Sequence, residues 1–513
     1  MTLFMEVSEM KMKKRNYPLI RTISFLLILV TLLSFWNKIF ALKYFTRVST
    51  WPTTSTINQF YKMEKNSVDV LFLGSSVVVN AFIPQEIYED YGIRSYNLGS
   101  EQQSPFLSYY LLKEAYKSQN PKAVVLDLKF MQRLHSEAIN TTERLTRKTV
   151  DPMHWSANKV ELIHTICNMD QSQSEISYYL TNIRFHSRWN DLKDYDFDSS
   201  QLEQSSMKGF GAIPDLNMVA NAGHEGRYGD ELTDPDPLML EYLDKISQPC
   251  QEKGSELILI NLPQSDLTDG SHNYNKNYAD AHQLKYYDLS EKERFEEILN
   301  SKVSECDASE PETVFISDHN NLWGAEKISS YMGHLLEDDC GILPVRDVQW
   351  ENTKGDYQEL RRASGLVLDG DFPTWSKQVC QDDNILLVSS YGSAAVFAQN
   401  EDYCRILENL GVTKFDEMQQ GMAYVGLLSK GKAIREMSIE NEAGITGKID
   451  QGHLLYQLKS QSGAGGNGAS ILLNAEENGV AGEGLNIVVY DTKQMKVIDS
   501  IAINPANGMG LQR

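Results

Sequence analysis

The chain has 513 residues, enough for about three domains of typical size. Its 48 Lys and Arg residues and 70 Asp and Glu residues give a formal net charge of −22, which argues against a nucleic-acid-binding protein because such proteins present a basic face. A hydrophobic share of 41% and an aromatic share of 10% exclude bulk disorder. The 6 cysteines include no Cys-x-x-Cys pair, so we expect neither a disulfide-built scaffold nor a structural zinc site, and no cofactor.

The N-terminal region has the pattern of a membrane anchor. A basic cluster over residues 11–15 precedes an uncharged apolar run over residues 23–36, and apolar residues continue to position 42. The flanking positive charge predicts a cytoplasmic N-terminus, with the bulk of the chain outside the cell. We therefore predict a basic tail and a single-pass anchor in the cell membrane over residues 1–42, followed by a polar stalk over residues 43–66. A cleaved signal peptide is the alternative, but it needs small residues before the cleavage site.

An α/β pattern begins at residue 67. Strand, helix, strand, helix and strand are predicted in turn over residues 68–73, 84–91, 94–99, 105–119 and 123–128. Alternation of this kind predicts a parallel sheet with right-handed crossovers.

The pattern is interrupted over residues 131–235, which are polar and contain helical stretches but no clear strand. We predict a helical insertion there, forming a cap beside the sheet. Strand-like residues 256–263 resume the pattern, followed by a weaker strand and a last helix, so we predict an α/β domain over residues 67–343. Short strands and frequent glycines then predict a β-rich domain over residues 350–513.

Two side chains in the predicted α/β domain are candidates for catalysis. Ser76 follows the first strand, where the ligand crevice of a parallel sheet lies, and its amide is placed to bind an oxyanion. His319 precedes the last helix, and histidine is the usual base for a serine nucleophile. Each residue alone is more often structural. Their combination, with Gly99 at another strand end between them, indicates nucleophilic catalysis.

These segments resemble the conserved blocks of the SGNH/GDSL hydrolases, and in particular the membrane-anchored SGNH-like proteins of bacterial cell envelopes. The similar segments are FLGSS at residues 72–76, YNLG at 96–99 and SDHNNLWGA at 317–325. The resemblance covers roughly residues 66–340 and implies a flavodoxin-like three-layer fold. It also implies that Ser76 is the nucleophile, that His319 is the general base and that Gly99 donates to the oxyanion hole.

Two positions depart from the family's pattern. Ile316 stands where the family has the aspartate that orients its histidine, so Asp318 or Asp127 would have to take that role. Asp127 also ends the third strand, where the family offers an asparagine to the oxyanion hole, and a carboxylate there opposes a developing negative charge. A Ser–His pair without an orienting acid is slower but still active.

Two functions of different classes therefore stay open. The first is a cell-surface esterase or O-acyltransferase that acts on acyl groups of an envelope polysaccharide. The second is a catalytically degenerate, glycan-binding surface protein. An acyl-transfer partner in teichoic-acid D-alanylation is a third possibility, because it shares the anchored SGNH layout.

The C-terminal region resembles a second family. Residues 484–491 and 496–500 predict a β-hairpin. Together with residues 385–388, 407–411 and 423–426, they resemble the interleukin-like EMT inducer (PANDER-like) domain. The order of the segments is permuted here, with the hairpin last. The resemblance implies a compact β-sandwich, and because some relatives bind carbohydrate, it implies a glycan partner.

Overall fold

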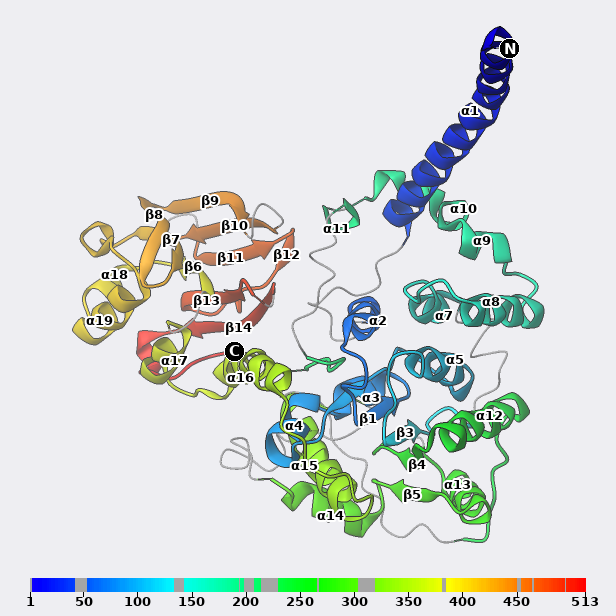
Figure 1. The fold of residues 1–513 in the computed structure, drawn as a ribbon. Helices are drawn as coiled ribbons and strands as arrows, with labels where there is room; N and C mark the ends of the chain where they lie inside the picture. Colours follow the sequence, from blue (N-terminus) through cyan, green and yellow to red (C-terminus); the bar gives the residue numbers. More distant parts are fainter. Residues whose placement is uncertain are drawn as a thin grey trace.

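The computed structural model describes residues 2–41, 53–132, 143–192, 194–197, 207–213, 229–264, 267–302, 319–380, 384–449, 454–463, 466–493 and 495–513 (Figure 1). The chain is an α/β protein with two separate sheets: a five-stranded parallel sheet and a nine-stranded mixed sheet. The parallel sheet is formed by the region predicted to be α/β. The mixed sheet is formed by the C-terminal region.

The parallel sheet has the strand order β2-β1-β3-β4-β5. Its strands are β1 (Val70–Leu73), β2 (Ser95–Asn97), β3 (Ala123–Asp127), β4 (Glu256–Asn261) and β5 (Lys285–Asp288). The order reverses between β1 and β3, and α/β sheets bind ligands in the crevice at the carboxyl ends of such a strand pair.

Both faces of this sheet are covered, which explains why its strands have continuous apolar runs rather than an alternating pattern. Leu71 and Leu73 pack on one side, while Val70 and Phe72 pack on the other. The first face is covered by helices α5 (Pro105–Ala115), α8 (Ala157–Met169), α12 (Pro237–Lys253) and α13 (Asp269–His282). The second face is covered by α3 (Ser76–Ala81), α4 (Pro84–Tyr91), α14 (Lys292–Asn300) and α15 (Leu322–Asp338).

The expected polar stalk over residues 43–66 is corrected in part. Residues 53–62 form helix α2 (Thr53–Lys62), whose Ile57 and Phe60 are buried in the same core cluster as Leu71. The Tyr96 hydroxyl donates to the Thr56 carbonyl at 2.8 Å. This short helix looks polar in sequence because four of its six buried residues are Thr or Ser.

The segment between β3 and β4 is helical, and its described residues form no strand. It contains α7 (Glu143–Val150), α8, α9 (Glu175–Tyr179), α10 (Thr181–Phe185), the 3-10 helix η1 (His186–Asn190) and α11 (Asp194–Phe197). Figure 1 shows part of this group next to the end of the long helix α1 (Thr2–Phe40). Within the described residues, the 23-residue stretch Pro18–Phe40 of α1 is long and apolar enough to cross a membrane, with a mean hydropathy of 2.1.

Helix α16 (Val348–Gly365) connects the two sheets and packs on the first one. Trp350 lies against Tyr88, with ring centroids 5.3 Å apart. Tyr357 donates to Glu326 of α15 at 3.0 Å, and Arg361 pairs with the same carboxylate at 2.6 Å. The core cluster of the C-terminal unit begins only at Ala363 and Leu366, after these contacts.

The mixed sheet has the order β12-β11-β10-β6-β13-β14, with β7 and β8 joined to β6 and with β9 joined to β10. Its strands are β6 (Asn384–Tyr391), β7 (Met422–Ser429), β8 (Lys432–Glu440), β9 (Glu442–Ile449), β10 (Leu454–Gln461), β11 (Gly468–Leu473), β12 (Glu476–Glu477), β13 (Gly484–Asp491) and β14 (Lys496–Ile503). The antiparallel pairing of β13 with β14 confirms the predicted hairpin.

The two faces of the central strands β6, β7 and β13 are covered differently. Strands β9, β10 and β11 pack on one face, as in a sandwich. The other face is covered by helices α17 (Phe372–Val379), α18 (Ala395–Ala398) and α19 (Glu401–Leu410). The unit is therefore a mixed sheet with helices on one face, and it resembles a β-sandwich only on the other.

An ion-pair cluster fastens the start of β1 to the start of α16. Arg94 binds the Asp69 carboxylate at 2.7 Å and the Asp347 carboxylate at 2.9 Å, and Lys122 lies 3.1 Å from Asp69. Burial raises the pKa of Asp69, but the hydrogen bonds and charges of Arg94 and Lys122 outweigh it and lower this pKa below its ordinary value.

We expect Arg94→Met to lower the thermal midpoint of the purified protein at pH 7 by several degrees, because a charge-assisted hydrogen bond contributes about 1.5–3 kcal/mol. A carboxyl group with a lowered pKa stabilises the fold above its unfolded pKa, near 4, and this stabilisation is lost as the pH falls below it. The difference in thermal midpoint between the wild-type protein and Arg94→Met should therefore be smaller at pH 3 than at pH 7. Lys122→Met is the matched control. The Lys122 side chain is 46% exposed, so its replacement should lower the thermal midpoint by less. An equal drop in the thermal midpoint would contradict the role given to Arg94.

Candidate functional site

A glycine turn places Ser76 at the carboxyl edge of the parallel sheet. Ser76 is the first residue of α3, directly after β1 and the turn at Gly74 and Ser75. Gly74 has φ +154°, and a Cβ at this position would lie 2.6 Å from Val78 Cγ2 and 2.9 Å from Asp127 Cβ. Only glycine fits this space, so the close approach of β1, β3 and α3 depends on it.

Ser76 lies within hydrogen-bonding distance of His319. The Ser76 Oγ and His319 Nε2 atoms are 2.9 Å apart, although 243 positions separate the two residues in sequence. His319 lies just before α15, whose N-cap residue Asn321 accepts the Gly324 amide at 2.9 Å. Both side chains are half-buried, so they remain open to a substrate. The separation is that of a nucleophile and its general base.

Gly99, the predicted oxyanion donor, lies against the same turn. A Cβ on Gly99 would be 3.0 Å from the Gly74 carbonyl oxygen and 3.3 Å from that of Ser75. Neighbouring backbone amides already have acceptors in the turn. The Val78 amide donates to the Ser75 carbonyl, and the Ser100 amide donates to the Gly74 carbonyl. Within the part of the chain that the structure describes, the Ser76 and Gly99 amides donate to no acceptor. An oxyanion requires such donors.

Of the two carboxylates considered for orienting His319, Asp127 lies within the described residues. Asp318 and Ile316 lie outside the described residues. Asp127 lies beside the Ser76 turn, where its carboxylate accepts the Leu262 amide at 3.5 Å and is only 4% exposed. This carboxyl group is therefore buried next to the strand end that carries Ser76.

The helical insertion contributes residues near the site that the sequence did not point to. Thr149 of α7 lies 2.5 Å, hydroxyl to hydroxyl, from Ser100, the residue after Gly99. Lys148 pairs with Glu101 and is almost fully buried, and this burial lowers the pKa of Lys148. The pattern of α7 carries no motif that predicts these contacts. They brace the loop that presents the Gly99 amide.

A second histidine–carboxylate pair lies at the same edge of the sheet. The His272 Nδ1 atom is 2.7 Å from Asp288 Oδ2, and both residues are buried. Asp288 also accepts the amide and the hydroxyl of Ser290, at 3.0 and 2.6 Å. Because these groups are buried and bonded to one another, the pair fits a structural link between α13 and β5 better than a reactive site.

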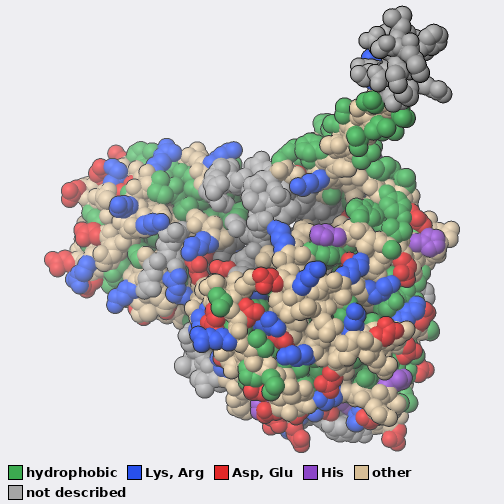
Figure 2. All heavy atoms as spheres, in the orientation of Figure 1, with side chains coloured by type: hydrophobic (Ala, Val, Ile, Leu, Met, Phe, Trp, Pro, Cys, Tyr) green, Lys and Arg blue, Asp and Glu red, His purple; other side chains and the backbone are tan. Residues whose placement is uncertain are grey.

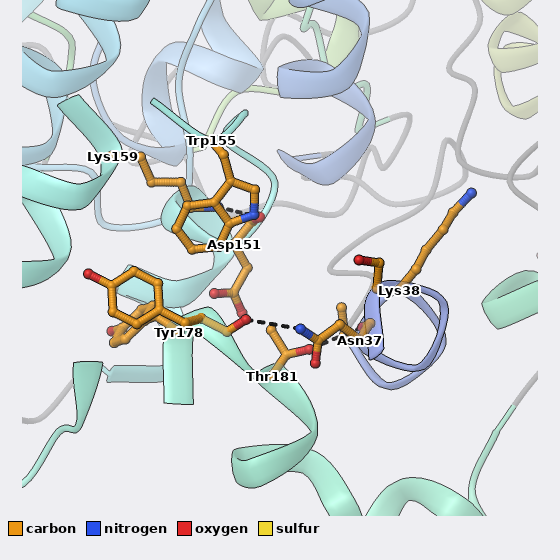
Figure 3. A pocket seen from close by; sticks show the side chains of 10 residues that line it. Asn37, Lys38, Asp151, Trp155, Lys159, Tyr178 and Thr181 are labelled. Atoms are coloured by element: carbon orange, nitrogen blue, oxygen red, sulfur yellow. Dashed lines mark hydrogen bonds between the residues drawn. The ribbon is translucent and has the colours of Figure 1, made fainter. Parts of the chain in front are cut away.

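A cavity of about 340 Å³ lies away from Ser76, between the end of α1 and helices α8 to α10 (Figure 3). Its lining residues are Ser34, Asn37, Lys38, Ala41, Asp151, Trp155, Lys159, Tyr178, Tyr179 and Thr181. Burial lowers the pKa of Lys159 to about 8. None of the Ser76 site residues lines this cavity. Among the described residues, no group of three or more His, Cys, Asp or Glu side chains is placed to hold a metal ion.

No protein-family model matches this chain, and no curated protein matches it. Among solved structures, the chain is similar to one described as a gut microbial diltiazem-metabolizing enzyme, at 11% sequence identity and a TM-score of 0.16. The match covers 78% of this chain and 57% of that one, so this chain spans little more than half of that enzyme's length. A TM-score this low carries no argument about fold or function.

We expect Gly74→Ala to destabilise the protein far more than Gly254→Ala. Both glycines have a positive φ, but a Cβ at Gly254 meets no atom within 4 Å, whereas one at Gly74 collides with Val78 and Asp127. Overpacking costs about 1–3 kcal/mol at Gly74, and the φ of +154° there suits an L-residue less than the left-handed φ of +72° at Gly254. Thermal unfolding of the two purified variants measures the difference. Equal midpoints would show that the turn tolerates a side chain.

Proposed function

We propose that this protein is a membrane-anchored serine esterase or O-acyltransferase of the SGNH type, acting on acyl groups of an envelope polysaccharide. The observation that carries the proposal is the 2.9 Å separation of Ser76 Oγ and His319 Nε2 at the carboxyl edge of a parallel sheet. The strand order β2-β1-β3-β4-β5 supports it, since this is the flavodoxin-like order that the SGNH resemblance implies. The apolar helix α1 is consistent with a cell-surface location.

The proposed reaction begins with attack of Ser76 Oγ on the acyl carbonyl carbon while His319 Nε2 takes the hydroxyl proton. The amides of Ser76 and Gly99 hold the oxyanion of the tetrahedral intermediate. His319 then returns the proton to the leaving sugar hydroxyl, and the acyl group stays on Ser76 as an ester. Water, or a second hydroxyl, attacks this ester with His319 again as base, which releases the acid or the transferred ester.

The C-terminal unit is proposed to bind the glycan. Its resemblance to the interleukin-like domain is the basis, and the β13–β14 hairpin is in keeping with it. Helix α16 packs against α4 and α15 through Trp350 and Tyr357, so a glycan held by this unit would stay close to the α/β unit.

A catalytically degenerate, glycan-binding protein is the second candidate. The observation that favours it is the buried Asp127 carboxylate beside the Ser76 turn. A negative charge at this place opposes the oxyanion that the reaction must form. The two candidates differ in whether Ser76 is chemically activated.

Fluorophosphonate labelling of the purified full-length protein tests the activation of Ser76. We expect the wild-type protein to be labelled on the peptide that contains Ser76, and Ser76→Ala to lose the label. His319→Ala should slow labelling by about two orders of magnitude, since general base catalysis contributes at least that much.

Two matched controls accompany this experiment. Ser75→Ala removes the neighbouring hydroxyl, which is 1% exposed, and His164→Ala removes a surface histidine; both should keep the wild-type labelling rate. If the wild-type protein takes no label, while it and Ser76→Ala bind envelope polysaccharide equally well, the esterase proposal fails and the glycan-binding one replaces it.

Asp127→Asn should raise the rate of serine-dependent hydrolysis of a small aryl acetate. The substitution keeps an acceptor for the Leu262 amide but removes the negative charge beside the turn. A gain of about 1.4 kcal/mol in transition-state stabilisation corresponds to roughly tenfold in rate. The steady-state rates of the two proteins measure it. A lower rate in Asp127→Asn would show instead that this carboxylate supports the site.

A further inference from the structure

The C-terminal end of α1 is fastened to the helical insertion. The Asn37 side-chain amide donates to the Tyr179 carbonyl at 2.9 Å, and the Thr181 hydroxyl donates to the Asn37 carbonyl at 3.0 Å. Figure 3 shows Asn37 and Thr181 facing each other across this contact. Arg188 donates to the carbonyls of Phe40 and its successor, both at 2.9 Å. The last carbonyls of a helix lack partners within it, so Arg188 caps α1.

The burial of α1 marks where a bilayer would end. Large apolar side chains from Leu19 to Trp36 are exposed, whereas Ile39 and Phe40 are buried against the insertion. The exposed stretch is about 27 Å long at ~1.5 Å per residue, close to the ~30 Å hydrocarbon thickness of a bilayer. If α1 crosses a membrane, the hydrocarbon ends near Trp36, and the helices fastened to Asn37 lie at the level of the lipid headgroups.

These same helices expose an unusual set of apolar side chains, which we call the collar. Its members are Trp155 at 56% exposure, Ile176 at 51%, Ile183 at 47%, Trp189 at 71% and Phe197 at 65%. They come from the turn before α8 and from α9, α10, η1 and α11, and the last three of these elements contact α1. In Figure 2, hydrophobic atoms continue from α1 onto the adjoining surface of the molecule.

We propose that the collar binds the phospholipid leaflet around the C-terminal end of α1, with its side chains in the interfacial region of the bilayer. Tryptophan favours this region because its ring is apolar and its N–H is polar. Continuity with α1 is the reason to assign the surface to lipid. The cavity beside Asn37 lies at the same level, and its aromatic side chains, Trp155, Tyr178 and Tyr179, suit the same boundary. The collar would then hold the α/β unit in one orientation on the membrane.

Lipid quenching of tryptophan fluorescence tests the proposal on the full chain. The protein is placed in vesicles of phosphatidylcholine and phosphatidylglycerol, with part of the lipid brominated near the top of the acyl chains. The emission lost in Trp189→Phe, relative to wild type, reports the environment of Trp189. We expect the fluorescence emitted by Trp189 to be quenched by the brominated lipid and to be protected from acrylamide in the water.

The matched control is Trp350→Phe, because Trp350 is 1% exposed and packs at the junction with α16. The emission of Trp350, which is the emission lost in this variant, should be unaffected by brominated lipid. Trp155→Phe gives a second probe of the collar if Trp189→Phe fails to fold, as judged by near-ultraviolet circular dichroism.

Two results would overturn the proposal. If acrylamide reaches Trp189 and brominated lipid does not quench it, the collar faces water. If Trp189 is protected from acrylamide but remains unquenched by the lipid, a second copy of the chain or another protein covers the collar instead of the bilayer.

Discussion

The candidate site depends on how closely three strand ends approach one another. Gly74 has no side chain, which leaves room for Val78 of α3 and for Asp127 at the end of β3. Gly99 lies against the carbonyl of Gly74, so the end of β2 meets the same turn. The Ser76 hydroxyl and the amides of Ser76 and Gly99, which donate to no acceptor among the described residues, therefore come together because of two glycines. A side chain at Gly74 would separate the backbone segments that carry Ser76 and the amide of Gly99.

The sequence predicts the elements that have a strong local signal and misses those that tertiary contacts create. Strands β1, β3 and β4 were predicted from their apolar runs, and their observed bounds differ only at the ends; β2 and β5, which have weaker patterns, were also predicted as strands. The bounds of helix α3 were not predicted, since Val77, Val78 and Val79 favour a strand; packing between the sheet and α15 overrides this preference. Helix α2 was not predicted, because among its buried residues only Ile57 and Phe60 are apolar and so give little sequence signal.

The proximity of Ser76 and His319 was expected from the SGNH resemblance, and the structure brings the two side chains to 2.9 Å. Pattern alone places Ser76 at the carboxyl edge of the parallel sheet, but it places His319 only before the last helix. The contacts of Lys148 and Thr149 were not predictable, since the insertion has no motif and its helix α7 meets the Gly99 loop only through the tertiary fold. The chemical role of the pair remains a prediction, because geometry shows reach and not reactivity.

The insertion links the candidate site to the long apolar helix α1 through one series of packed side chains. Thr149 of α7 contacts the loop after Gly99, and the neighbouring Arg147 is buried with its guanidinium 3.7 Å from the centre of the Tyr178 ring. Tyr179, the next residue along, accepts the Asn37 amide of α1. Side chains packed in this way transmit position, because a close-packed interior does not deform continuously. If α1 crosses a bilayer, helix packing therefore sets the height of Ser76 above that bilayer.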